Sequence, residues 1–199
     1  MKNAFDRLHR LYDPFMRLTG FYADETIIRL LRPEPHERFI DVGGGTGWIA
    51  RHIAQHGPSV TVLDISLGML SHVDGPSGVR AVCGDGRRMG IRSGVFDGAV
   101  LSDALHHIPE TEWLLGEVAR VLRPGGRLLM HDFERTSRWV RLLQTLESRL
   151  VEKVRYSSMD ELGPWLRAAG FDHGETVRTR LAFFTVWRKD GRRATTEEN

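Results

Sequence analysis

Cysteine is nearly absent from this sequence. Its 199 residues contain a single cysteine, Cys83, so no disulfide can form within the chain. The nine histidines are scattered, and no Cys/His cluster has the ligand spacing of a structural zinc site. The sequence therefore excludes a disulfide-stapled scaffold, and it predicts a protein without metal that works in a reducing compartment.

Long apolar runs are missing as well. No stretch approaches the roughly 20 residues that a membrane-spanning helix needs. Where a signal peptide would be apolar, the first residues are charged at Lys2, Asp6, Arg7, Arg10 and Asp13. We therefore expect a soluble, cytoplasmic protein of one domain, which at this length buries roughly 70% of its unfolded surface.

An excess of charge of one sign is also missing. Lys and Arg number 28 against 26 Asp and Glu, and the net charge of +2 is too small to require a nucleic-acid partner. No nucleic acid is expected. The alternative would rest on basic residues near the carboxyl terminus, which we interpret as a solvated face: Arg178, Arg180, Arg188, Lys189, Arg192 and Arg193.

Glycine, in contrast, is concentrated at one point. An apolar run over residues 39–42 ends in Gly43-Gly44-Gly45-Thr46-Gly47, after which apolar residues return with helical spacing. This pattern predicts a strand, a tight turn and a helix start, with a main chain that a ligand can approach and amide groups that favour an anionic group. The spacing is G-x-G-x-G. A dinucleotide-binding loop would need a further glycine where Trp48 stands.

Two carboxylates follow at the ends of predicted strands. Asp64 ends a β-branched run over residues 59–65 and lies 17 residues beyond the last loop glycine, where such folds place an acid on ribose hydroxyls. The alternative is that Asp64 caps a helix starting near Ser66. Asp85 ends a third strand, where its carboxylate can accept from an adenine amino group while Gly86 lets the backbone approach the ring.

The order of these segments is typical of one family. Further strands are predicted over residues 95–101 and 127–132, separated by a helix from Pro109 to Leu122. The chain resembles the class I methyltransferases that use S-adenosylmethionine, closest to those of menaquinone and ubiquinone biosynthesis and phospholipid N-methylation. The matching motifs lie between about Phe39 and Asp132: Asp41 to Gly47, Leu63-Asp64, Met69-Leu70, Gly84-Asp85, Phe96-Asp97, Ala104 to His107 and Glu117 to Gly126.

The resemblance implies S-adenosylmethionine as cofactor and S-adenosylhomocysteine as product. It places the glycine loop under the methionine portion, Asp64 on the ribose, Ile65 and Met69 beside adenine and ribose, and Ser102 beside the methionine end. One departure is Gly44, where the family usually has another residue, often cysteine; we expect cofactor binding to remain intact. The implied cofactor residues are Asp41, Gly43, Gly44, Gly45, Gly47, Asp64, Ile65, Met69, Asp85, Gly86 and Ser102.

The expected fold is an α/β, Rossmann-like, seven-stranded and mostly parallel sheet with helices on both faces and an antiparallel last strand. Its parts are an N-terminal helical arm (1–32), a cofactor-binding core (37–132), a helical insertion or lid after the fifth strand (133–156), the C-terminal part of the sheet (157–190) and a disordered tail (191–199). We expect the arm and the insertion to roof an apolar acceptor pocket that includes Tyr12, Tyr22, Trp139 and Leu143.

Methyl transfer from an activated sulfonium needs mainly positioning, and a general base helps where the acceptor arrives protonated. The candidate bases are His107, our first choice, His106 and His131, because an unperturbed histidine is largely neutral at physiological pH. For each of them the alternative is a capping or packing role.

The main function hypothesis is methyl transfer to an apolar or aromatic small molecule. The first alternative is a membrane-associated quinone or phospholipid methyltransferase, with the basic amphipathic segment 133–156 in peripheral contact with the bilayer. The second is a non-catalytic, S-adenosylmethionine-binding regulatory or assembly subunit. The sequence also leaves a homodimer open.

Overall fold

A computed structural model describes residues 24–74, 78–108, 110–134, 157–179 and 182–191. The predicted acceptor-pocket residues Tyr12, Tyr22, Trp139 and Leu143 lie outside this part of the chain, as do residues 1–23 of the predicted arm and 135–156 of the predicted insertion. In the described part, no helix is long and apolar enough to cross a bilayer.

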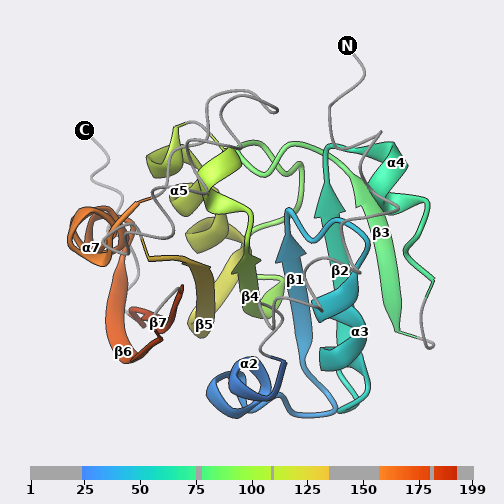
Figure 1. Cartoon of the computed structure of the whole chain (residues 1–199), viewed down its shortest axis with the longest axis horizontal. Coiled ribbons are helices and arrows are strands. Elements are labelled where there is room, and N and C mark those ends of the chain that lie inside the picture. Colours follow the sequence, from blue (N-terminus) through green and yellow to red (C-terminus); the bar gives the residue numbers. More distant parts are fainter. Residues whose placement is uncertain (1–23, 75–77, 109, 135–156, 180–181, 192–199) are drawn as a thin grey trace.

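Seven strands form one sheet in the order β3-β2-β1-β4-β5-β7-β6 (Figure 1). Strands β1 to β5 are mutually parallel, whereas β7 runs antiparallel to both of its neighbours. This confirms the predicted sheet. The strands are β1 Arg38–Val42, β2 Ser59–Asp64, β3 Val79–Cys83, β4 Phe96–Ser102, β5 Leu122–Phe133, β6 Phe171–Arg178 and β7 Ala182–Lys189.

Helices cover both faces of the sheet, as predicted. One core packs α5 and α7 against the sheet, and the other packs α2 and α3 against its opposite face. Because β1 and β4 are covered on both sides, they read as nearly continuous apolar runs. The helical elements are α2 Asp24–Leu31, α3 Trp48–Ala54, α4 Leu67–Leu70, the 3-10 turn η1 Leu105–His107, α5 Thr111–Val121 and α7 Met159–Ala168.

The fifth strand differs from the prediction at both ends. It was expected over residues 127–132, but it begins at Leu122, which pairs with Phe96, and runs through Phe133. The intervening residues 123–126 bulge out, because the next pair in the register is Gly98 with Arg127. Pro124 has no amide hydrogen to donate to the ladder. A strand inside a sheet can accommodate such a residue at a bulge.

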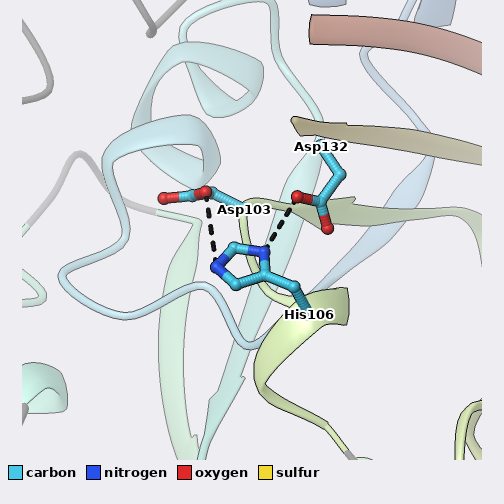
Figure 2. Close-up of side chains that lie close together, drawn as sticks. All are labelled: Asp103, His106 and Asp132. Atoms are coloured by element: carbon cyan, nitrogen blue, oxygen red, sulfur yellow. Dashed lines mark hydrogen bonds and ion pairs between the residues drawn. The ribbon is translucent and has the colours of Figure 1, made fainter. Parts of the chain in front are cut away.

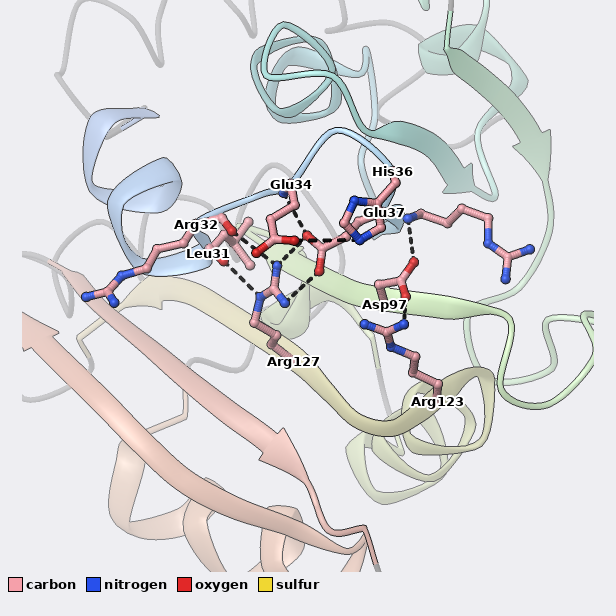
Figure 3. Close-up of polar contacts among 9 residues, drawn as sticks. Leu31, Arg32, Glu34, His36, Glu37, Asp97, Arg123 and Arg127 are labelled. Atoms are coloured by element: carbon pink, nitrogen blue, oxygen red, sulfur yellow. Dashed lines mark hydrogen bonds and ion pairs between the residues drawn. The ribbon is translucent and has the colours of Figure 1, made fainter.

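An ion-pair network closes the amino-terminal edge of the sheet (Figure 3). The guanidinium of Arg127 on β5 donates to both carboxylate oxygens of Glu37, at 2.8 and 2.6 Å, and to the carbonyl of Leu31 at the end of α2, at 2.8 Å. Glu37 is 3% exposed. Burial acts to raise the pKa of Glu37, but the hydrogen bonds from Arg127 hold it below its ordinary value.

Asp97 at the start of β4 extends this network (Figure 3). One of its oxygens accepts from the backbone amide of Arg38, at 2.6 Å, and the other pairs with the Arg123 guanidinium, at 2.6 Å. The network thereby fastens α2, β1, β4 and β5 to one another at the edge opposite to the predicted site.

Candidate active site

The glycine loop joins β1 to α3 at the carboxyl-terminal edge of the sheet, where the arrowheads of β1 and β2 end in Figure 1. Gly43, Gly45 and Gly47 have φ angles of 71°, 54° and 76°, which only glycine adopts without strain. A Cβ atom on Gly43 would lie 2.6 Å from the Cβ atom of Ala104, so the loop also packs closely against the segment after β4.

Asp41 lies directly beneath this loop. Its carboxylate is 1% exposed, and among the described residues neither oxygen has a hydrogen-bond partner of regular geometry. Burial raises the pKa of Asp41 to about 7; the negative charge of Asp64 adds to the rise, and the Ala50 amide offsets only part of it. A Cβ atom on Gly44 would lie 2.5 Å from an Asp41 oxygen, so the glycine at this position makes room for the carboxylate.

Asp64 ends β2, as predicted, and its carboxylate makes the contact near Ser66 that the capping alternative expected, while its role on the ribose stays a prediction. One oxygen accepts from the Ser66 amide at 2.8 Å, which caps the following turn, and the other accepts from the Gly45 amide at 3.0 Å. Asp64 therefore ties the glycine loop to the end of β2. Met69 of α4 lies against the same loop, because its methyl carbon would be 3.0 Å from a Cβ atom on Gly45, and Ile65 is exposed beside it.

Asp85 lies at the same edge but is engaged by a neighbour that the sequence reasoning did not single out. Arg87 donates to both oxygens of Asp85, with a shortest distance of 2.7 Å, and also to Glu110 at 2.6 Å. Hydrogen bonding from Arg87 holds the pKa of Asp85 below its ordinary value. Gly86 is required by packing, since a Cβ atom there would lie 2.9 Å from Val42. The adenine role of Asp85 and Gly86 stays a prediction.

Ser102 and His131 are opposite each other at the ends of β4 and β5. The Ser102 hydroxyl lies 2.9 Å from His131 Nδ1, and the imidazole stacks on the Phe184 ring at a centroid distance of 4.3 Å. Burial lowers the pKa of His131 to about 4, so this ring is neutral at physiological pH.

His106 lies between two aspartates at this edge (Figure 2). Its Nδ1 is 2.8 Å from Oδ1 of Asp132, and its Nε2 faces Oδ1 of Asp103 at 3.9 Å. Burial acts to raise the pKa of Asp132, but the charge and hydrogen bond of His106 hold it below its ordinary value. A carboxylate can only accept, so Nδ1 carries a proton toward Asp132, and in the neutral form of the ring Nε2 has the lone pair.

His107 is less well suited to a catalytic role than its neighbour. Burial, followed by the charge of His106, lowers the pKa of His107 to about 3, which makes it a weak base at neutral pH. Its ring centroid lies 3.9 Å from that of His106. His107 stays a prediction, but the geometry favours His106. The sequence reasoning assigned no role to Asp132, although its place after His131 at a strand end was a usable signal.

The absence of metal was expected from the sequence. In the described part of the chain, ligand atoms of Asp103, His106 and Asp132 lie within 4.8 Å of one another, a spacing that can surround a cation. The direct hydrogen bond between His106 and Asp132 occupies one ligand atom of each, so the observed geometry is that of a histidine oriented by a carboxylate.

This strand order, with a glycine loop and two strand-end acids at the carboxyl edge, defines a class I methyltransferase domain. The sequence matches the family described as "Methyltransferase domain" over residues 14–175, more than half of its length, and the chain therefore belongs to that family. Membership confirms the predicted class and, with it, S-adenosylmethionine as the methyl donor of the class.

Curated relatives of the chain include demethylmenaquinone methyltransferases. The chain is 37% identical over 103 residues to the demethylmenaquinone methyltransferase of Corynebacterium kroppenstedtii, a match that covers 52% of this chain and 44% of the relative. The chain thus spans about half the length of the curated relatives that it matches.

Two solved structures share the fold. A chain from the complex of the Haloferax volcanii Trm112 methyltransferase activator with a methyltransferase is 17% identical, with a TM-score of 0.86 over 96% of this chain and 99% of that chain. The phosphoethanolamine N-methyltransferase 2 of Haemonchus contortus, solved with S-adenosylhomocysteine, is 17% identical, with a TM-score of 0.72 over 84% of this chain and 52% of that chain.

Proposed function

We propose that this protein transfers a methyl group from S-adenosylmethionine to an aromatic small molecule, with a quinone precursor of the demethylmenaquinone type as the preferred acceptor. The observation that carries the proposal is the His106–Asp132 pair, which lies at the same sheet edge as the glycine loop of the family. The quinone-type acceptor is supported by the relatives named for it.

The residues at the loop fit the cofactor. Asp41 is a buried carboxylate that has no hydrogen bond of regular geometry among the described residues, beside a main chain kept open by glycine, and it suits a ligand that carries positive charge. S-adenosylmethionine has an ammonium and a sulfonium group. The residues that would hold it are Asp41, Gly43, Gly44, Gly45, Gly47, Asp64, Ile65, Met69, Asp85, Gly86 and Ser102.

When bound, the cofactor supplies a methyl group that its sulfonium charge has already activated. The protein's own task is then to hold the acceptor in line and to remove a proton where the acceptor is a phenol or a quinol. Nε2 of His106 carries the lone pair for that step. Asp132 keeps the imidazole in this tautomer and stabilises the charge that it gains, and Asp103 adds a second negative charge at 3.9 Å.

A specific observation favours a lipophilic setting for this reaction. In the described part of the chain, the exposed large apolar side chains are Ile65, Leu67, Val82 and Trp113. Ile65 and Leu67 follow the end of β2, Val82 is near the end of β3, and Trp113 is in the first turn of α5. All four therefore lie toward the carboxyl edge. We propose peripheral membrane contact at this edge, which would suit a lipophilic acceptor. Co-sedimentation with anionic and neutral liposomes tests this contact.

The acceptor is tested by S-adenosylhomocysteine release from purified protein. We expect turnover with a reduced, short-chain demethylmenaquinone analogue and much less with matched phenol, amine and phosphatidylethanolamine substrates. Turnover confined to the amine or the phospholipid would contradict the quinone acceptor. Absence of turnover with all four, although cofactor binds, would favour the regulatory or assembly subunit.

Cofactor binding is measured separately by calorimetry. Wild-type protein should bind S-adenosylhomocysteine, and Asp64→Ala should weaken binding by about 1.5–3 kcal/mol through the loss of charge-assisted hydrogen bonds. Unchanged affinity in a folded Asp64→Ala variant would limit Asp64 to its backbone contacts. Heat with a nicotinamide dinucleotide but not with S-adenosylhomocysteine would overturn the assignment.

A further inference from the structure

A second concave site lies between α7 and β6, the strand at one end of the sheet order. It is a surface groove of about 650 Å³. The side chains that line it come from one helix and two strands, and they are Met159, Asp160, Arg167, His173, Thr176, Arg178 and Trp187, with the backbone of Gly163. None of these residues belongs to the proposed methyl-transfer site.

A bulge in β6 builds the polar wall of this groove. His173 pairs with Trp187 and Thr176 pairs with Thr185, so three steps along β6 correspond to two along β7. The extra residue reverses the alternation of faces. As a result Thr176 and Arg178 share the α7 face with His173, while Val177 packs into the core on the opposite face.

Hydrogen bonds hold this wall in place. The Thr185 hydroxyl lies 2.8 Å from the Thr176 hydroxyl, which in turn lies 2.8 Å from His173 Nε2. The His173 ring stands edge-on to the Trp187 ring at a centroid distance of 4.8 Å. Trp187 is 2% exposed, and its indole N–H has no acceptor among the described residues. A buried donor without an acceptor is uncommon and costs stability.

The positive charges of the groove are not neutralised by carboxylates of the groove itself. Arg167 and Arg178 both line it, and among the described residues neither guanidinium has a carboxylate at ion-pair distance. Arg167 folds over α7 with its terminal nitrogen 3.4 Å from the Cβ position of Gly163. Asp160 is the one acid of the lining, and Glu175 of the bulge pairs with Arg29 of α2 instead, at 3.6 Å.

We propose that this groove binds a small oxyanion, a phosphate or carboxylate group carried by a small molecule, between Arg167 and Arg178. Arginine presents paired N–H donors that match both groups, the Trp187 indole offers a further donor, and the threonine-anchored His173 lines the same wall. The site is separate from methyl transfer and does not rest on the proposed function.

Calorimetric titration with inorganic phosphate and with succinate, each at ionic strength matched by sodium chloride, tests the site and separates the two chemistries. We expect saturable binding of one anion, weakened about tenfold or more in Arg167→Ala and in Arg178→Ala, since each loses hydrogen bonds to a charged group. Arg188→Ala is the matched control, because Arg188 is an exposed arginine of β7 outside the groove, and it should change affinity less than twofold.

Tighter binding of phosphate assigns a phosphate-bearing ligand, and tighter binding of succinate assigns a carboxylate. Affinity for S-adenosylhomocysteine should be equal in wild type, Arg167→Ala and Arg178→Ala, which keeps this test independent of the methyl-transfer site. Absence of saturable heat with both anions, or an equal loss of affinity in Arg188→Ala, would overturn the proposal.

Discussion

The two edges of the parallel sheet differ in how their charged groups are satisfied. At the amino-terminal edge, Glu37 is buried against the Arg127 guanidinium, which also donates to the carbonyl of Leu31. At the carboxyl-terminal edge, Asp41 is equally buried, but among the described residues its carboxylate has no regular hydrogen bond and its pKa is raised to about 7. One carboxylate stabilises the fold, and the other lowers its stability.

The difference shows which edge is built for a ligand. A fully paired buried ion pair has nothing left to offer to a bound molecule, whereas an unpaired buried carboxylate gains from any ligand that brings a cation. Substitutions at the amino edge should therefore reduce the stability of the fold with little effect on catalysis or cofactor binding. Substitutions at the carboxyl edge should weaken catalysis or cofactor binding.

The largest effect is expected at the carboxyl edge. His106→Gln should lower kcat by about 10²–10⁴-fold, the usual contribution of a general base. The matched control is His107→Gln, with a much smaller loss. Steady-state kinetics with the best acceptor measures both. Equal losses in the two variants would remove the distinction drawn from the Asp132 contact.

Arg127→Met tests the opposite edge. It keeps the aliphatic stem but leaves the 3%-exposed carboxylate of Glu37 without its cation, so the free energy of unfolding should fall by about 3–5 kcal/mol. Urea denaturation measures the loss. Affinity for S-adenosylhomocysteine in the folded fraction should be unchanged; a loss of affinity as large as the loss of stability would show that the two edges are not independent.

Asp41→Asn should change the free energy of unfolding in the opposite direction to Arg127→Met. Asp41 titrates near 3.8 when unfolded and near 7 when folded, so between these values the folded state binds the extra proton and the free energy of unfolding falls as pH rises from about 4 to about 7. Asparagine removes this dependence. The variant should be more stable above pH 7, by on the order of 2–4 kcal/mol, yet bind S-adenosylhomocysteine more weakly. Denaturation curves at pH 5 and pH 8 measure the first effect, and a variant less stable than wild type at pH 8 would refute it.

The smallest effect is expected for Arg123→Ala, again at the amino edge. The Arg123 side chain is 51% exposed, and Asp97 keeps its hydrogen bond from the Arg38 amide, so the loss should be about 1 kcal/mol or less. If Arg123→Ala lost as much free energy of unfolding as Arg127→Met, solvent exposure would not explain the difference between the two ion pairs.

The sequence predicted the central sheet well because local signals agreed with one another there. The glycine loop, the strand ending in Asp64 and the apolar run of β4 lie at their expected places. The start of β5 was wrong, because residues 123–126 read as a turn and nothing local shows that Leu122 pairs with Phe96 before it. The groove at β6 was also not foreseen, since its bulge reverses a face assignment that alternation alone would give.

Site residues that belong to a sequence motif could be predicted. Site residues whose role depends on a contact with another side chain in the folded protein were harder to predict. Asp41 and Asp64 stand at motif positions. Asp132 and Arg87 gain their roles from His106 and Asp85, which lie 26 and 2 residues away and are joined to them only in the folded chain. The preference for His107 over His106 could not be revised from sequence, because both histidines have the same neighbours along the chain.

The contact of Arg127 with the end of α2 also bears on the order of folding events. Arg127 and Leu31 are 96 residues apart in sequence, so their hydrogen bond closes a long loop and becomes favourable only after β5 has joined the sheet. We expect contacts of this kind to form late and to be largely absent from the transition state. Losing this one should therefore accelerate unfolding far more than it slows folding, which makes the amino edge a determinant of how long the native state persists.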